Sequence, residues 1–167
     1  DESDHVTGAV ITITDITIQK QTEDRLRLTA SVFDTVSEAT VVTDKDNKIM
    51  SINNAFVTIT GYSANEVIGQ DPGILSSNKQ SQSFYRGMWK ALAKNGLWQG
   101  EVVNKRKNGE LYTEWLSITT LKNDDGEVIR YIGVFSDVSE AKQTQELIEK
   151  QANYDPLTGL ANRSLIR

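Results

Sequence analysis

The 167-residue sequence contains no cysteine, which excludes disulfide bonds, thiolate nucleophiles, thiolate metal ligands and photochemistry on a cysteine sulfur. Its single histidine, His5, lies near the start of the sequence, so we expect no histidine-ligated metal or haem inside the core. No Ser-His-Asp or Cys-His set can be assembled, and no glycine-rich phosphate loop occurs. We therefore expect that this fragment is not an enzyme.

Positive charge and long apolar runs are also scarce. The net charge of -5 argues against nucleic-acid binding, which needs clustered Lys and Arg. The basic cluster Lys105 to Lys107 precedes Asn108-Gly109, a hairpin-turn signal, and is typical of a solvated hairpin end. Because no secretory or membrane-spanning run appears, we expect a cytoplasmic location and no membrane contact in this fragment.

The stretch from 84 to 96 has a helical pattern. Its apolar residues form one broad stripe, which predicts a helix that presents Trp89 inward: Phe84, Tyr85, Met88, Trp89 and Leu92. Asn95-Gly96 is a helix stop signal. The expected helix therefore forms one wall of the core.

The next residues change to a period of two. Alternation predicts a strand whose inward face carries Trp98, Gly100, Val102 and Asn104. A carboxamide on an apolar face needs partners for its donors and its acceptor, so an inward Asn104 near Trp89 raises the question of a bound ligand.

Turn and cap signals predict the remaining elements. We expect strands at 39–43 and 49–52, a short helix from Asn53-Asn54 to Gly61, and a second one with a capping box from Ser63 to Glu66. A break at 71–73 precedes the long helix, which is expected to begin near residue 80. Three more strands follow, at 98–105, 111–121 and 127–136. The order β-β-α-α-α-β-β-β, with an antiparallel sheet covered on one face by helices, is an α+β fold.

Similar segments flank this core. GAVITITDIT near the start and YIGVFSDVS near the end each lead from a strand into a helix, and the residues KQT recur after both. The second helix carries a short heptad seam, which we interpret as a site of parallel dimerisation: Val138, Ala141, Gln145, Ile148 and Ala152. The alternative interpretation is that each helix packs on its own domain.

The core from about Ser31 to Asp137 resembles a PAS sensory domain. The resemblance rests on the VVTD strand, the segment NNAFVTITGY (53–62), the NKRKNG hairpin and the closing strand YIGVFSD. It implies a five-stranded antiparallel sheet with short helices on one face, and GAVITITDIT is similar to the last strand of another PAS domain. The expected division is 1–16 as the tail of a preceding PAS-like domain, 17–33 as a linker helix, 34–137 as the PAS domain and 138–152 as a signalling linker helix.

The last stretch, ANYDPLTGLANR (152–163), is similar to the opening of GGDEF domains, which in that family join two GTP molecules into cyclic di-GMP. We expect 153–167 to be the beginning of such a domain, truncated before any of its phosphate, metal or GG[DE]EF residues. The resemblance implies a parent diguanylate cyclase, with a phosphodiesterase domain beyond it as a further option. The downstream partner in cis is then the GGDEF domain.

Flavin-binding PAS domains offer two comparisons. Light-oxygen-voltage domains form a photoadduct on a cysteine, and here Pro72 stands in that place, which rules out adduct chemistry. Glu114 and Phe135 also replace an Asn and a Gln of that family. The FAD-binding redox PAS domains of the nitrogen-fixation regulator and methane-oxidation sensors are more similar, through the segment from Asp71 to Leu75 and the spacing of Trp89 and Asn104.

This second resemblance implies FAD as the cofactor. Trp89 would stack on the isoalloxazine ring, Asn104 would hydrogen-bond its polar edge, and Trp98 and Glu114 would complete the lining. If Glu114 faces the pocket, burial raises its pKa and makes it a proton partner for a reduced flavin.

Simpler interpretations stand beside this one. Trp89 can be plain core, Trp98 can plug the sheet, and Asn104 can be satisfied by backbone groups or water. Glu114 can face solvent, because residues 111–121 alternate ambiguously. The pocket can then be empty, filled with water or occupied by another small ligand, and the domain would serve only as a dimerisation scaffold that positions catalytic domains.

Overall fold

A computed structural model describes residues 14–153 of the chain. The chain divides into two units, residues 1–33 and 34–167, and each is considered by itself. Helix α1 (Thr17–Thr35) begins where the Thr17 amide donates to the Asp15 carboxylate at 2.9 Å, and none of its residues is buried. Within residues 14–153, no helix is long and apolar enough to span a bilayer.

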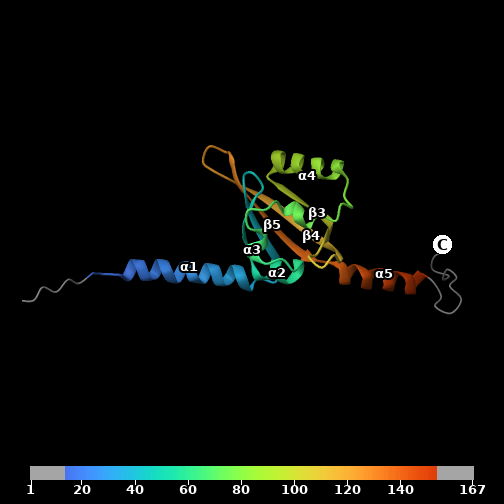
Figure 1. The fold of residues 1–167 in the computed structure, drawn as a ribbon, viewed down its shortest axis with the longest axis horizontal. Coiled ribbons are helices and arrows are strands. Elements are labelled where there is room, and N and C mark those ends of the chain that lie inside the picture. Colours follow the sequence, from blue (N-terminus) through green and yellow to red (C-terminus); the bar gives the residue numbers. More distant parts are fainter. Residues whose placement is uncertain (1–13, 154–167) are drawn as a thin grey trace, which may run out of the picture. The chain divides into compact units, whose positions relative to one another are not determined.

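The second unit is built on a five-stranded antiparallel sheet with the order β2-β1-β5-β4-β3 (Figure 1). Its strands are β1 (Ala39–Asp44), β2 (Ile49–Ile52), β3 (Leu97–Lys105), β4 (Leu111–Lys122) and β5 (Val128–Asp137). Strands β1 and β5, the first and last of these five along the sequence, pair with each other, and β5 lies at the centre of the sheet. The predicted order of elements and the α+β fold are confirmed.

Short helices lie on one face of this sheet. They are α2 (Asn54–Thr60), α3 (Ala64–Val67), the 3-10 turn η1 (Pro72–Leu75) and α4 (Gln82–Asn95), and α5 (Ser139–Asn153) follows the last strand. The Ser81 hydroxyl caps α4 by accepting from the Phe84 amide at 3.2 Å, so this helix begins two residues later than predicted. The predicted break at 71–73 lies in a 3-10 turn, whose N-cap is Asp71.

The core lies between these helices and the sheet. Phe56 of α2 meets Phe135 of β5 edge to face, with ring centroids 5.9 Å apart. The buried Asn53 side chain joins β1 to α2, because its oxygen accepts from the amides of Thr40 and Phe56 at 2.9 and 3.0 Å. Its amide nitrogen donates to the carbonyl of Glu38 at 2.9 Å. This satisfied buried carboxamide caps α2 as predicted.

Both outer strands of the sheet have part of their outer edge covered. On β2, the Ile49 amide donates to the Gln70 carbonyl at 2.9 Å, and the Gly69 amide donates to the Ile49 carbonyl at 2.8 Å. On β3, Ser76 forms a bridge with Asn104, and the Ser77 hydroxyl donates to the carbonyl of Val103. The connection that carries η1 therefore protects backbone groups at both edges.

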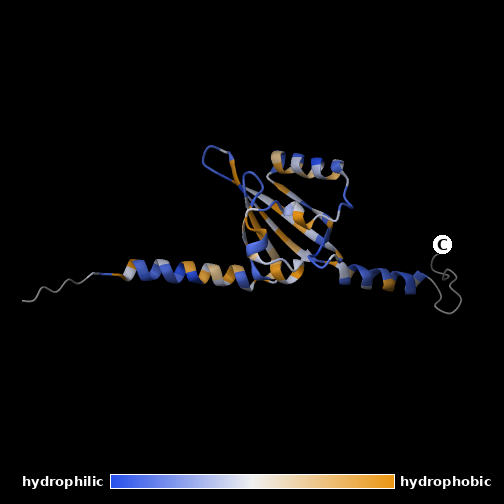
Figure 2. Ribbon diagram, viewed as in Figure 1, coloured by the Kyte–Doolittle hydropathy of each residue, from blue (hydrophilic) through white to orange (hydrophobic). Residues whose placement is uncertain are grey.

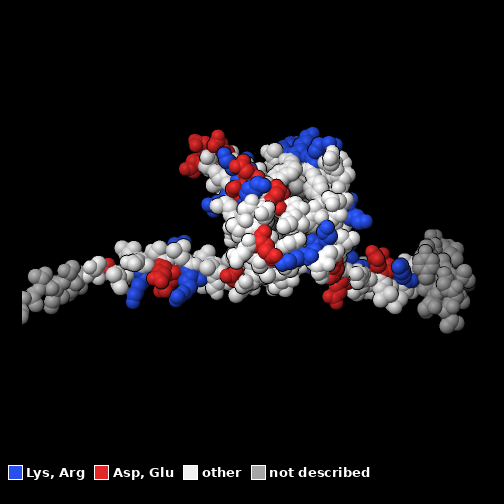
Figure 3. Space-filling model, in the orientation of Figure 1, with Lys and Arg blue, Asp and Glu red and all other residues white. Residues whose placement is uncertain are grey.

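Polar residues dominate two other parts of the surface. Basic side chains cover the outer side of α4, and acidic side chains gather at the tip of the β4–β5 hairpin (Figure 3). Helix α5 is largely hydrophilic apart from one hydrophobic band (Figure 2), where Leu147 and Ile148 are 56% and 54% exposed.

Candidate ligand cavity

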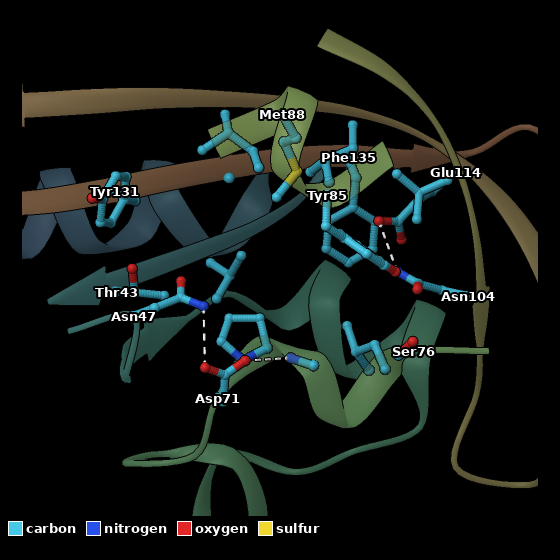
Figure 4. A pocket seen from close by; sticks show the side chains of 18 of the residues that line it. Thr43, Asn47, Asp71, Ser76, Tyr85, Met88, Asn104, Glu114, Tyr131 and Phe135 are labelled. Carbon is cyan, nitrogen blue, oxygen red and sulfur yellow. Dashed lines mark hydrogen bonds between the residues drawn. The ribbon is translucent and has the colours of Figure 1, made fainter. Parts of the chain in front are cut away.

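A cavity of about 330 Å³ lies between the sheet and the helices η1 and α4 (Figure 4). Most of its wall is apolar, with side chains from four strands and both helices: Val41, Leu75, Met88, Val102, Leu116 and Phe135. Polar side chains line it at two opposite ends. We call these the inner end, formed by Asn104 and Glu114, and the mouth, formed by Asn47, Asp71, Trp89 and Tyr131.

Strand alternation places both residues of the inner end. Asn104 of β3 is 8% exposed and Glu114 of β4 is 2% exposed. The Asn104 amide nitrogen donates to Oε1 of Glu114 at 3.0 Å. The ambiguous phase of residues 111–121 is therefore resolved, because Tyr112, Glu114 and Leu116 face inward and Trp115 faces out.

The second carboxyl oxygen of Glu114 is not satisfied. Within residues 14–153, Oε2 has no hydrogen-bond partner, although it is buried. Burial raises the pKa of Glu114 to about 7, against the opposing effects of the nearby Tyr112 hydroxyl and of the Asn104 hydrogen bond. Close to neutral pH, this group can therefore either accept a hydrogen bond as a carboxylate or donate one as an acid.

The mouth is more exposed and is held by different contacts. The Asn47 amide donates to Oδ2 of Asp71 at 3.2 Å, and Oδ1 of Asp71 accepts from the Gly73 amide at 2.8 Å. Trp89 of α4 meets Tyr131 of β5 edge to face, with ring centroids 5.3 Å apart. Figure 4 shows Asn47, Asp71 and Tyr131 at the end of the cavity opposite to Asn104 and Glu114.

The inward position predicted for Trp89 is only half right. Trp89 lines the cavity, but 37% of it is exposed, whereas Met88 and Leu92 are the buried residues of α4. The reason is geometric, because successive helical residues are about 100° apart and Trp89 lies at the edge of the stripe centred on Met88. From this position the Trp89 ring can still stack on a ring at the mouth of the cavity.

Trp98 is not among the residues that line the cavity. It shares the inward face of β3, as predicted, but its ring meets Phe84 of α4 edge to face at 5.6 Å. The ring also covers Gly100, where an added Cβ would lie 2.7 Å from it. Trp98 therefore fills the space between α4 and the start of β3.

Sequence reasoning missed most of the mouth. Asn47 lies in the β1–β2 turn with a φ of 59°, and Tyr131 begins the inward series of β5. The residues around Asn47 have a composition typical of a turn, and this pattern predicts the turn but not a binding site. The cation–π contact of Arg106 with the Tyr112 ring, 4.5 Å from the centroid, was also not foreseen.

The arrangement described above matches a known family. The family model described as "PAS domain" matches residues 37–140, which include all strands of the sheet. The chain belongs to the PAS domain family. PAS domains are sensory signalling domains, and the predicted family and fold are thus confirmed.

Relatives of this PAS domain occur in regulatory proteins. A "Nitrogen fixation regulatory protein" from Klebsiella oxytoca is 34% identical over 110 residues, which cover 64% of this chain and 22% of that protein. The PAS domain of a Colwellia psychrerythraea protein has a similar crystal structure, with a TM-score of 0.65 and 26% identity over 70% of this chain and 99% of the other. The structure titled "Flavin Analogue Sheds Light on Light-Oxygen-Voltage Domain Mechanism" has a TM-score of 0.60 and 27% identity over 72% of this chain and 92% of the other.

Proposed function

We propose that this chain is a sensory PAS module that holds a flavin in its cavity and transmits the state of the cavity through α5 to a GGDEF domain. The observation that carries the proposal is the inner end. Glu114 lines a ligand-sized cavity beside a carboxamide, and one of its buried carboxyl oxygens has no hydrogen-bond partner within residues 14–153. The similarity to the light-oxygen-voltage structure with a flavin analogue supports the same class of ligand, and the sequence resemblance favours FAD.

The residues present fit the ring system of a flavin. At about 330 Å³ the cavity is at the small end of ligand pockets, so the ring would fill it and the remainder of FAD would leave through the mouth. The apolar walls suit the two faces of a ring, while Asn104 and Glu114 offer a donor and an acceptor to its polar edge. A bound flavin supplies redox chemistry.

The chain contributes orientation and control of protons. Asn104 and Glu114 fix the direction of the polar edge, and Trp89 covers the ring at the mouth. Because its pKa is about 7, Glu114 can hold or release a proton at its Oε2 atom at neutral pH. Pro72 lies in η1 beside the cavity, and with no cysteine in the chain adduct formation plays no part.

An absorption spectrum tests the flavin. The 167-residue chain, purified from cells supplied with riboflavin, should absorb in the visible range of flavins, and Asn104→Ala should lose most of this absorption. Gln99→Ala is the matched control, because Gln99 lies on the same strand but faces out. A colourless wild-type protein contradicts flavin binding, and equal retention in both variants removes Asn104 from the site.

Transmission through α5 rests on other observations. Leu147 and Ile148 are exposed on an otherwise polar helix, and pairing with a second copy would cover them. The motif 152–163, most of which lies outside the described residues, supports a GGDEF domain after the linker 138–152. In this proposal, residues 34–137 are the sensory PAS domain, residues 1–16 are the tail of a preceding domain, and residues 17–33 are the helix that links the two.

A second candidate function is a dimerisation scaffold without a ligand, favoured by the same exposed residues of α5. Light scattering over a dilution series measures the dimer, and Ile148→Glu should shift it toward monomer, whereas Glu149→Gln should not. A colourless protein that dimerises through α5 supports the scaffold. A protein that remains monomeric at all concentrations contradicts pairing of the helices in both versions.

A further inference from the structure

The carboxyl group at the inner end lies directly opposite a second acid. In the antiparallel pairing of β4 and β5, Glu114 is the register partner of Asp137, the last residue of β5. Side chains at such paired positions have Cβ atoms about 5 Å apart, and like charges placed there destabilise the sheet. One of these acids faces the cavity, and the other one lies at the start of α5.

Asp137 holds the first turn of α5 in place. Its Oδ1 accepts from the Ser139 amide at 2.9 Å, and the Ser139 hydroxyl accepts from the Thr113 amide at 2.8 Å. The Val138 amide in turn donates to the Thr113 carbonyl at 2.9 Å. The beginning of α5 is thus attached to the residue immediately before Glu114.

A guanidinium group lies against Asp137 and against a neighbour of Glu114. Arg106 donates to Oδ2 of Asp137, and the same group lies 4.5 Å from the centre of the Tyr112 ring. Tyr112 is two residues before Glu114 on the inward face, and its hydroxyl is buried without a hydrogen-bond partner in residues 14–153. Arg106 also donates to the carbonyl of Ile59, at the end of α2, and its side chain is 19% exposed.

We infer that Glu114 and Asp137 form a cross-strand acid pair, with Arg106 bound to Asp137, through which the charge on the cavity carboxyl controls how firmly the first turn of α5 is held. This gives the proposed signalling role a mechanism, but it requires no flavin. Any event that changes the charge on Glu114, such as a bound donor or a change of pH, acts in the same way.

The direction follows from the charges around the pair. The groups that face Glu114 or its neighbours are Tyr112 on β4, Asp137 on β5 and Arg106 at the end of β3, with Tyr85 and Asp71 across the cavity. Burial opposes ionisation of Asp137, but hydrogen bonds from Ser139 and Arg106 hold its pKa below the usual value. Asp137 is therefore already charged when Glu114 ionises, and the second charge weakens the cap.

Reciprocity sharpens this expectation. If the charge on Glu114 destabilises the charged form of Asp137, the charge on Asp137 must destabilise the charged form of Glu114 by the same free energy and so raise the pKa of Glu114. Burial is the larger cause of the raised pKa of Glu114, and Asp137 acts in the same direction. Asp137→Asn, which can still cap α5, should therefore lower this pKa, and Arg106→Gln should raise it.

Nuclear magnetic resonance on the flavin-free 167-residue chain tests the pair. The side-chain carboxyl signal gives the pKa of Glu114, and amide hydrogen exchange gives the protection of Ser139 after correction for the intrinsic effect of pH. As Glu114 ionises, we expect protection of Ser139 to fall on the order of five-fold, the lower end of coupling between linked sites. In Glu114→Gln the protection should not change with pH.

Lys107→Gln is the matched control. It removes the same charge one residue further along, from an ion pair with Glu66 in which both side chains are more exposed. The pKa of Glu114 should not move in this variant. If Arg106→Gln does not fold, Arg106→Lys keeps the charge but loses the planar stacking and the fork of donors.

Two results would overturn the inference. One is an unchanged pKa of Glu114 in Asp137→Asn. The other is a protection of Ser139 that follows pH equally in the wild type and in Glu114→Gln. Because the sample contains no flavin, neither result bears on flavin binding, and a colourless protein leaves the acid pair open to the same test.

Discussion

The two ends of the cavity are polar for different reasons. At the inner end, one carboxamide and one acid are almost completely buried, and the acid has a raised pKa with one unsatisfied oxygen. At the mouth, Asn47 and Asp71 satisfy each other and the backbone, and the aromatic pair of Trp89 and Tyr131 is open to solvent.

The two ends should therefore differ in what they contribute to ligand binding. A buried polar group without a hydrogen-bond partner lowers the stability of the ligand-free domain. It also increases the affinity for a ligand that supplies the missing hydrogen bond. A satisfied, exposed group changes little when a ligand arrives. The inner end should therefore dominate both the stability of the empty domain and the choice of ligand, and the mouth should contribute mainly contact area.

The largest expected effect is a pH dependence that arises at the inner end. Because the pKa of Glu114 is raised from 4.5 to about 7, its contribution to stability is complete below pH 4.5 and is lost as pH rises through 7. That shift corresponds to a loss of about 3 kcal/mol at most, using about 1.4 kcal/mol per pKa unit.

Urea unfolding at about pH 5 and about pH 8 measures this loss. Glu114→Gln should remove most of the difference between the two pH values, whereas Asp71→Asn at the mouth should leave it intact. A wild-type protein that is equally stable at both pH values would show that Glu114 is not buried as an ionisable group.

An intermediate effect is expected from the two carboxamides. Asn104→Ala removes the hydrogen bond to Glu114 and should cost roughly 1–3 kcal/mol of unfolding free energy, because a buried oxygen loses its partner. Asn47→Gly should cost about 1 kcal/mol or less, since Asp71 remains hydrated and glycine accepts the φ of 59°. Equal losses, measured by urea unfolding at constant pH, would remove the distinction between the two ends.

The smallest effect should come from the aromatic pair at the mouth. Trp89→Leu loses an edge-to-face contact and some packing, which we expect to amount to about 1 kcal/mol or less because the ring is 37% exposed. Thermal unfolding measures the change, with Trp98→Leu as the comparison. Trp98 fills the space beside Phe84, so its replacement should be clearly more damaging.

Local rules placed Asn104, one of the two residues of the inner end, from the sequence. The alternation along β3 put Asn104 on the apolar face, and caps at Asn53, Gly61 and Gly96 placed the helices around it. These signals depend on neighbouring residues in the chain, so they can be read without the fold. The five-stranded arrangement followed from the family resemblance and is confirmed.

Contacts between distant segments could not be read in this way. Asn47 and Asp71 meet only because the β1–β2 turn and the start of η1 converge, and Trp89 reaches Tyr131 only because α4 packs over the sheet. The phase of β4 was undecided because apolar residues occur on both of its faces, as Trp115 and Leu116 illustrate. The exposed edge position of Trp89 depends on a helix rotation that the stripe alone does not fix.

The covered edges of the sheet have a consequence for proteins that carry several such domains in series. Neighbouring copies of one fold on a single chain are held at high local concentration, where open strand edges favour intermolecular pairing and misassembly. In this domain the residues around Ile49 and Val103 already bond to the connection that carries η1. The cavity and the protection of the edges thus depend on the same short connection, so a substitution that loosens it should promote aggregation as well as change the shape of the cavity.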